Sequence, residues 1–166
     1  VLVEIDELSL QALGQWPWPR VLVAQLLDSI ATMHPNGIGL DILFPEVDRN
    51  SPIHLKKFYT EFFGLSPELS GLPDELLDND NIFKESIQNT FSTLPIVLSN
   101  RTVKKNQCYS KIANIVLSDS LKDIYQYPFS LCSIDKLQKS SMVNGFINAY
   151  LDNDGHYRRT PLILKK

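Results

Sequence analysis

Three acidic residues next to apolar runs have the clearest capacity for chemistry. Asp6 and Glu7 end the apolar run at residues 1–5, and Asp41 lies within the run at residues 38–44. Continuous apolar runs of this length are typical of strands covered on both faces, as in parallel sheets. We predict neighbouring parallel strands for the two runs, which would gather the three carboxylates near one sheet edge.

Carboxylates gathered in this way have two interpretations. With Glu46 or Asp48 they could hold Mg²⁺ or Ca²⁺, because these cations prefer several oxygen ligands. A metal-dependent hydrolase with Asp6 and Asp41 as metal ligands at the strand ends is then the alternative function. A charge inside an apolar run is costly unless it is paired, so an ion pair is the commoner solution. We expect Asp41 to pair first with Arg20 and second with Arg158, and we assign no metal and no cofactor.

A stiff aromatic segment lies between the first predicted strand and the helix that follows. It consists of Trp16, Pro17, Trp18, Pro19 and Arg20. One interpretation is a ligand-binding platform at the end of the sheet where α/β proteins bind ligands. The other is that the tryptophans close the core while the prolines fix the turn, because large aromatic side chains usually serve packing. The residues that we expect to line or brace the site are Asp6, Trp16, Trp18, Arg20, Asp41 and Arg158.

The histidines and cysteines do not form a recognisable site. His34, His54 and His156 share no metal-type spacing, and we interpret all three as surface or loop residues. Cys108 and Cys132 are too few for a zinc cluster and could form one disulfide or stay as buried thiols. The sequence also lacks a phosphate-binding glycine loop and a nucleophile elbow, which is modest evidence against an enzyme.

The segment Asp152-Asn153-Asp154-Gly155 resembles the start of a calcium loop, but cations follow it where later carboxylate ligands should stand. An Asp-Gly pair between two strand-like runs instead predicts a hairpin, here between residues 143–151 and 157–164. We expect a carboxylate within the fold to pair with one of the two arginines that follow, Arg158 and Arg159.

Composition limits the partners. The chain has 166 residues, of which 43% are hydrophobic, and a net charge of -3. This predicts one globular domain over residues 1–166 with no general attraction to nucleic acid. The sequence has no apolar run of 18 residues and no export signal, and both ends look cut from a longer protein.

Alternating strand and helix patterns predict an α/β fold. We expect a mixed, mostly parallel central sheet with helices on both faces and a C-terminal antiparallel hairpin. Residues 46–79 are polar and irregular apart from an amphipathic stretch at 54–63, and we interpret them as an insertion or lid. Besides the strands at 1–5 and 38–44 and the hairpin, the expected elements are helices at 20–33, 80–92 and 130–139, a strand at 95–99 and a short strand at 112–117.

Three segments together resemble the CHASE type 2 family, the cyclase and histidine-kinase associated sensory extracellular domains. They occur in the family's order and span almost the whole chain, whereas residues 45–79 do not match well. The matching segments are Ile5-Asp6-Glu7-x-Ser9-Leu10 continuing to Gly14-Gln15-Trp16-Pro17-Trp18-Pro19-Arg20, Leu40-Asp41-Ile42-Leu43-Phe44, and Gly145-Phe146-x-Asn148 with Asp154-Gly155-x-x-Arg158-Arg159-x-Pro161-Leu162.

The resemblance implies a signal-input domain outside the cytoplasm, in the periplasmic part of a bacterial inner-membrane receptor. Flanking membrane helices would pass its state to a cytoplasmic nucleotide cyclase, diguanylate cyclase or kinase. The implied partner is an unknown small-molecule or protein signal, and a homodimer is a further expectation.

Overall fold

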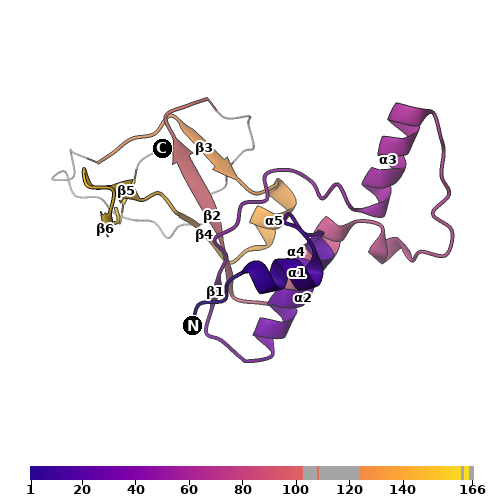
Figure 1. Ribbon diagram of the computed structural model, residues 1–166, viewed down its shortest axis with the longest axis horizontal. Helices are drawn as coiled ribbons and strands as arrows, with labels where there is room; N and C mark the ends of the chain where they lie inside the picture. Colours follow the sequence, from indigo (N-terminus) through magenta and orange to yellow (C-terminus); the bar gives the residue numbers. More distant parts are fainter. Residues whose placement is uncertain (103–107, 109–123, 162, 165–166) are drawn as a thin grey trace. The chain divides into compact units, whose positions relative to one another are not determined.

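The computed structural model describes residues 1–102, 108, 124–161 and 163–164 (Figure 1). These residues divide into two compact units, each formed by separate stretches of chain. Unit 1 contains residues 1–34 and 48–86, and unit 2 contains residues 35–47 and 87–166. The assignment of a single domain stays a prediction.

Unit 1 is helical. Helix α2 is amphipathic, and its core side chains Val23, Ala24 and Leu27 are buried. Its residue range agrees with the helix predicted at 20–33. The helical elements that begin in this unit are α1 (Glu7–Leu13), α2 (Arg20–Ala31), α3 (Pro52–Phe63), the 3₁₀-helix η1 (Asp74–Leu76) and α4 (Asn79–Gln88).

Local signals fix the ends of α1 and α3. Asp6 caps α1 by accepting a hydrogen bond from the amide of Ser9, and Pro52 is the first residue of α3. Gly64 ends α3 with a positive φ of 64°, a conformation that glycine adopts without steric cost.

Unit 2 contains a mixed sheet built around β2. This strand pairs in parallel with β1 and with β4, and antiparallel with β3. A separate antiparallel pair, β5 and β6, forms the C-terminal hairpin. The elements are β1 (Ile38–Gly39), β2 (Ser92–Ser99), β3 (Phe129–Cys132), α5 (Asp135–Ser140), β4 (Val143–Phe146), β5 (Tyr150–Leu151) and β6 (Tyr157–Arg159).

The α/β class, the mixed and mostly parallel sheet and the C-terminal hairpin confirm the predicted fold class. The hairpin turn is closed by the amide of Asp152, which donates to the His156 carbonyl at 2.9 Å, and Gly155 has a φ of 81°. The calcium-loop reading is not needed to explain this turn. That helices cover both faces of the sheet stays a prediction.

The sheet continues beyond β4 through a side chain. The amide group of Asn148 accepts a hydrogen bond from Leu98 N and donates one to Leu98 O, both at 2.8 Å. Asn148 thus satisfies both backbone groups of one residue of β2, which a paired strand would otherwise do.

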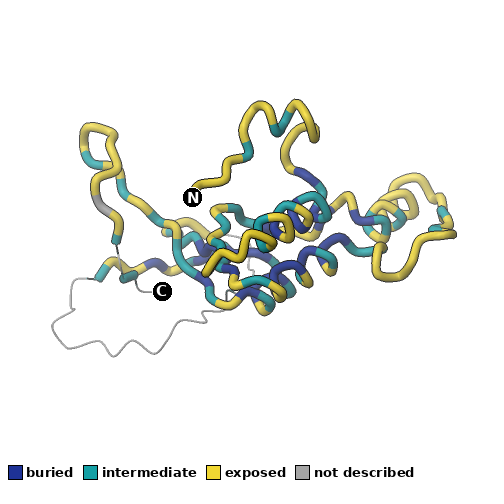
Figure 2. The backbone as a smooth tube through the Cα atoms, turned by 90° about the horizontal axis from the view of Figure 1, so that it is seen from below, coloured by how far each residue is buried: buried dark blue, intermediate teal, exposed yellow. Residues whose placement is uncertain are grey.

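Several element predictions were wrong. Residues 1–5 form no strand, and residues 1–4 are exposed, as the yellow segment at the label N in Figure 2 shows. Only residues 38–39 of the predicted strand at 38–44 are paired as a strand. The predicted helix at 130–139 divides into β3 and α5, and the predicted strand at 143–151 divides into β4 and β5. The short strand expected at 112–117 lies outside the described residues.

The predicted insertion at 46–79 contains α3 and η1. Its role as a lid or insertion stays a prediction. No helix among the described residues is long and apolar enough to cross a membrane.

Candidate functional site

The best-defined polar site of unit 1 begins where α2 begins. Pro19 precedes this helix and has no side-chain hydrogen-bonding group, so it cannot cap the free amides of the first turn. Asp48 takes this role from 28 residues away, because its Oδ2 accepts a hydrogen bond from the Arg20 amide at 2.7 Å. A carboxylate is also favoured here by the positive end of the helix dipole.

Asp48 connects α2 to the beginning of α4. Its Oδ2 also accepts a hydrogen bond from Asn79 Nδ2 at 2.8 Å, and its backbone amide donates to Asp80 Oδ2 at 2.9 Å. Ser51 adds a second link, since its Oγ accepts a hydrogen bond from the Asn79 amide at 3.0 Å. We call this set the buried Arg20 network, and its members are Arg20, Asp48, Ser51, Asn79 and Asp80.

The charged pair of this network is Arg20 with Asp80. Arg20 Nε lies 3.3 Å from Asp80 Oδ1, and the side chains are only 9% and 1% exposed. Burial lowers the pKa of the Arg20 guanidinium, and the charges of Asp80 and Asp48 oppose this shift. Burial likewise raises the pKa of Asp80, while the Asp48 amide and the Arg20 charge oppose the rise. The network therefore holds charged side chains in a buried site, where removing or displacing one of them would cost stability.

The partner predicted for Arg20 was wrong. Asp41 is exposed, and no ion pair involves it among the residues that the structure describes. An exposed carboxylate keeps its hydration and needs no counter-ion, which removes the reason for expecting an Arg20–Asp41 pair.

The prediction that carboxylates gather at the strand ends was also wrong. Asp6 does not follow a strand but caps α1, with its Oδ1 accepting hydrogen bonds from Ser9 N at 2.9 Å and Ser9 Oγ at 2.7 Å. These two bonds, the hydroxyl bond foremost, lower the pKa of Asp6. The hydrolase hypothesis placed Asp6 at a strand end, and the structure has no strand there.

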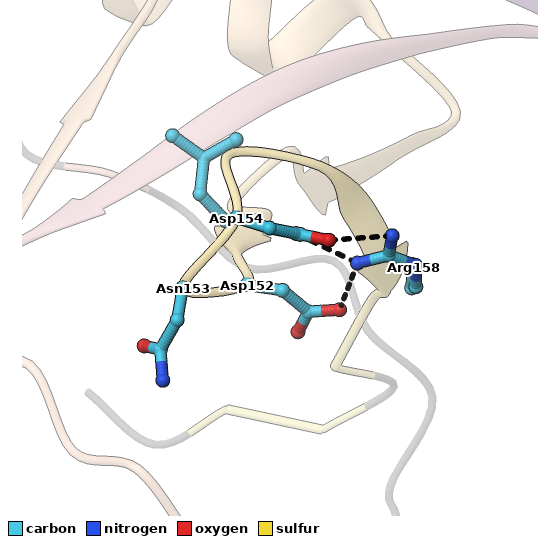
Figure 3. Close-up of a pocket in the computed structure, with 5 residues that line it drawn as sticks. Asp152, Asn153, Asp154 and Arg158 are labelled. Carbon is cyan, nitrogen blue, oxygen red and sulfur yellow. Dashed lines mark hydrogen bonds and ion pairs between the residues drawn. The ribbon is translucent and has the colours of Figure 1, made fainter.

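Arg158 finds its partners inside the C-terminal hairpin of unit 2. Its guanidinium donates to both carboxylate oxygens of Asp154 at 2.7 Å and to Asp152 at 3.1 Å (Figure 3). The predicted carboxylate partner is confirmed, although the partner is not Asp41. All three side chains are exposed or half-buried, so this is a surface cluster around a shallow hollow.

Comparison with known protein families decides the identity of the chain. The model of the CHASE2 domain matches residues 1–166. The chain belongs to the CHASE2 family. Searches of curated proteins and of solved structures gave no match. This match confirms the family resemblance predicted from the sequence, and CHASE2 is a family of extracellular sensory domains.

The two tryptophans of this CHASE2 chain have different environments. Trp18 is 4% exposed, and its Nε1 donates to the Gly14 carbonyl at 2.7 Å, as the packing interpretation expects. Trp16 is 38% exposed, and its ring centroid lies 5.9 Å from that of Trp18. The packing interpretation therefore describes Trp18, and a ligand contact at Trp16 stays a prediction.

Sequence reasoning named Arg20 in this CHASE2 chain but not the residues that pair with it. It named Asp48 only as a possible metal ligand, and no motif marked Asn79 and Asp80 at the start of α4. A usable signal did exist, because Asp80 stands in the first turn of a predicted helix beside a second acid, Asp78. The ligand-lining role assigned to Asp6, Trp16, Trp18, Arg20, Asp41 and Arg158 stays a prediction.

The two cysteines form a disulfide between residue 108 and β3, and Cys132 is fully buried. Of the two alternatives that the sequence left open, a disulfide or two buried thiols, the structure has the disulfide. Disulfides persist in oxidising compartments and are rare in the cytosol.

Proposed function

We propose that this chain is the periplasmic signal-input domain of a bacterial inner-membrane receptor. Its output would be a cytoplasmic nucleotide cyclase, diguanylate cyclase or kinase, connected through membrane helices outside residues 1–166. The observation that carries the proposal is the match of the CHASE2 model to the whole chain. The Cys108–Cys132 disulfide supports it, because such a bond suits a compartment outside the cytoplasm.

The signal in this proposal is a small molecule or a protein that binds one state of the domain better than another. A ligand shifts a conformational equilibrium only by its difference in affinity between two states. The buried Arg20 network supports such an input, because it ties the start of α2 to the start of α4 through contacts that tolerate little displacement. Breaking a buried charge pair by removing one partner leaves an uncompensated charge.

Topology is tested first, in intact cells of the full-length receptor carrying Asn153→Cys in the exposed hairpin turn. Both native cysteines are joined in the disulfide, so the new thiol reports alone for this domain. A membrane-impermeant thiol reagent admitted to the periplasm should label it without lysis of the inner membrane, while a cysteine placed in the output domain should require lysis. Labelling of Asn153→Cys only after lysis would overturn the periplasmic location.

Signal input is tested by the output activity of the full-length receptor. Arg20→Met should change the basal output per receptor in the membrane, measured after correction for the amount of receptor present, because it removes the cation of the buried network. Lys57→Met is the matched control, since Lys57 pairs with Glu61 on the exposed surface of α3 and is not a candidate site residue. Equal output from wild type and both variants would count against an input role for the network.

A further inference from the structure

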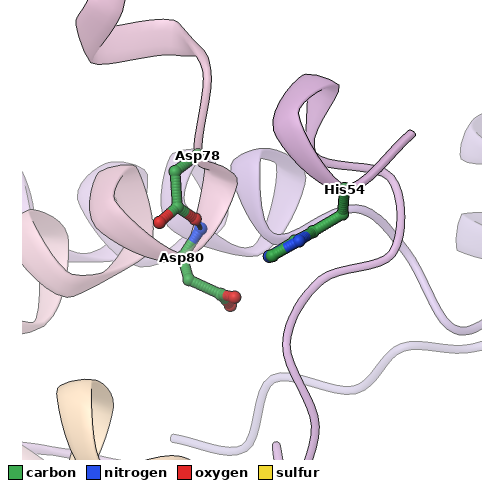
Figure 4. A group of neighbouring side chains, drawn as sticks. All are labelled: His54, Asp78 and Asp80. Atoms are coloured by element: carbon green, nitrogen blue, oxygen red, sulfur yellow. Dashed lines mark hydrogen bonds between the residues drawn. The ribbon is translucent and has the colours of Figure 1, made fainter. Parts of the chain in front are cut away.

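Three side chains of unit 1 converge at the facing starts of α3 and α4. They are His54 from the first turn of α3, Asp78 immediately before α4, and Asp80 from its first turn (Figure 4). One possible ligand atom from each residue lies within 4.8 Å of the others. We call this set the His54 cluster.

Backbone contacts hold the two helix starts together and so fix the cluster. The Ile53 amide donates to the Leu77 carbonyl at 3.1 Å, and Ser51 accepts hydrogen bonds from the amides of both His54 and Asn79. Side chains mounted on tied helix starts can keep a ligand geometry without reorganising. Two members of the cluster thus stand on helices, and the third, Asp78, is the residue that caps α4.

Asp80 contributes an oxygen with spare accepting capacity. Its side chain is 1% exposed, and Oδ1 accepts no hydrogen bond among the described residues, although it lies 3.3 Å from Arg20 Nε in an ion pair. Buried carboxylate oxygens are normally hydrogen-bonded or bound to a cation. Asp78 places a second carboxylate oxygen within 4.8 Å of a carboxylate oxygen of Asp80, so a further positive charge at this point would be stabilising.

His54 is the member that folding does not explain. Asp78 caps α4 by accepting a hydrogen bond from the Asp80 amide at 2.9 Å, and Asp80 pairs with Arg20, so both acids have structural roles. The imidazole of His54 is half-buried and forms no hydrogen bond or ion pair among the described residues. His54 lies on helix α3 and not in a loop, and its interpretation as a surface residue stays a prediction.

We propose that His54, Asp78 and Asp80 bind a divalent transition-metal ion, with Zn²⁺ as the best fit. An imidazole nitrogen favours zinc and its neighbours over Mg²⁺ and Ca²⁺, while two carboxylates complete a three-ligand set that leaves one position open. An ionised carboxylate has about four lone-pair sites on its two oxygens, so the contacts of Asp78 with the Asp80 amide, and of Asp80 with the Asp48 amide and Arg20, leave lone pairs for coordination. Metal binding here does not rest on the signalling role proposed above.

The test is isothermal titration of the 166-residue chain with ZnCl₂ after removal of metals by EDTA. Wild type should bind one Zn²⁺, and His54→Gln should weaken the affinity roughly tenfold or more, because a first-sphere ligand is lost. His156→Gln is the matched control: His156 is exposed and lies 3.5 Å from Asp154, so it is the competing place for adventitious zinc. This variant should bind as wild type does.

A second pair of variants separates coordination from folding. Asp78→Asn keeps a good helix cap but loses the charge, so it should weaken Zn²⁺ binding while circular dichroism stays unchanged. Asp74→Asn removes an exposed acid of η1 and should leave the affinity unchanged. Absence of binding by wild type, tighter binding of Ca²⁺ than of Zn²⁺, or full affinity in His54→Gln would each overturn the proposal.

Discussion

At the residue scale, Arg20 shows how a charged side chain can belong to a core. Its side chain is 9% exposed, and its helix start is held by Asp48 and its guanidinium by Asp80. Removing the cation would leave the carboxylates of Asp48 and Asp80 in a poorly hydrated site without the guanidinium that pairs with Asp80. The penalty comes from these uncompensated charges more than from the lost contact itself.

Arg20→Met should therefore lower the free energy of unfolding by about 3–5 kcal/mol. Urea unfolding of the chain measures this change. Arg158→Met should shift the midpoint little, because exposed ion pairs contribute little to stability. If the two substitutions shift the midpoint equally, the Arg20 network is not a stabilising core element.

Asp6 gives a prediction on pH. Hydrogen bonds from Ser9 lower its pKa below the ordinary value of 3.8, so its contribution to stability is fully present above pH 3.8 and is lost as the pH falls through the lowered value. Ser9→Ala removes the hydroxyl bond and keeps the amide bond, so the pKa of Asp6 should move up toward 3.8. An NMR titration of the Asp6 carboxyl measures this shift. Ser29→Ala, whose hydroxyl bonds only within α2, should leave the pKa unchanged.

At the scale of elements, predictions from local patterns agreed with the structure where a residue also marked the boundary of the element. The helix at α2 and the hairpin turn had both a periodic pattern and a boundary, namely Pro19 before the helix and Gly155 in the turn. The run at residues 1–5 had apolar residues but no evidence of a partner, and the structure leaves it unpaired. Apolar content alone does not tell a strand from an exposed segment.

Asn148 belongs to the scale of elements because its side chain makes the hydrogen bonds to β2 that a neighbouring strand would otherwise make. Asn148→Asp keeps an acceptor for Leu98 N but places a carboxylate against the Leu98 carbonyl, which loses its donor. The free energy of unfolding should fall by about 1–3 kcal/mol, the cost of an unsatisfied polar group. The same substitution at Asn153, exposed in the hairpin turn, should leave the urea midpoint near the wild-type value. A midpoint for Asn148→Asp equal to that of Asn153→Asp would show that the side chain does not support β2.

At the scale of the whole molecule, the sequence predicted the family and the fold class but not the contacts that join distant segments. The family motifs are contiguous strings, such as Trp16 to Arg20, and can be read directly. The hydrogen bonds of Asp48 in the Arg20 network join residues 28 to 32 positions apart, and the Arg20–Asp80 ion pair joins residues farther apart still. Pairing across such distances depends on tertiary packing, which a local sequence pattern does not reveal.

The Cys108–Cys132 bond is a long-range contact of unit 2 that the sequence left open between a disulfide and two thiols. It closes a loop with a sequence separation of 24 residues and is anchored on the fully buried Cys132. Loop closure of this length restricts the unfolded chain enough to stabilise the folded one by about 3 kcal/mol. Reduction should therefore lower the free energy of unfolding by that amount, which urea unfolding with and without dithiothreitol measures.

The control for this prediction is Cys108→Ala, which cannot form the bond. Its stability should lie near that of the reduced wild type, and dithiothreitol should not change it further. This comparison separates the bond from general effects of the reductant, because the variant keeps Cys132 in its buried place on β3. A wild-type chain that is insensitive to dithiothreitol despite demonstrated reduction would mean that the fold holds without the bond.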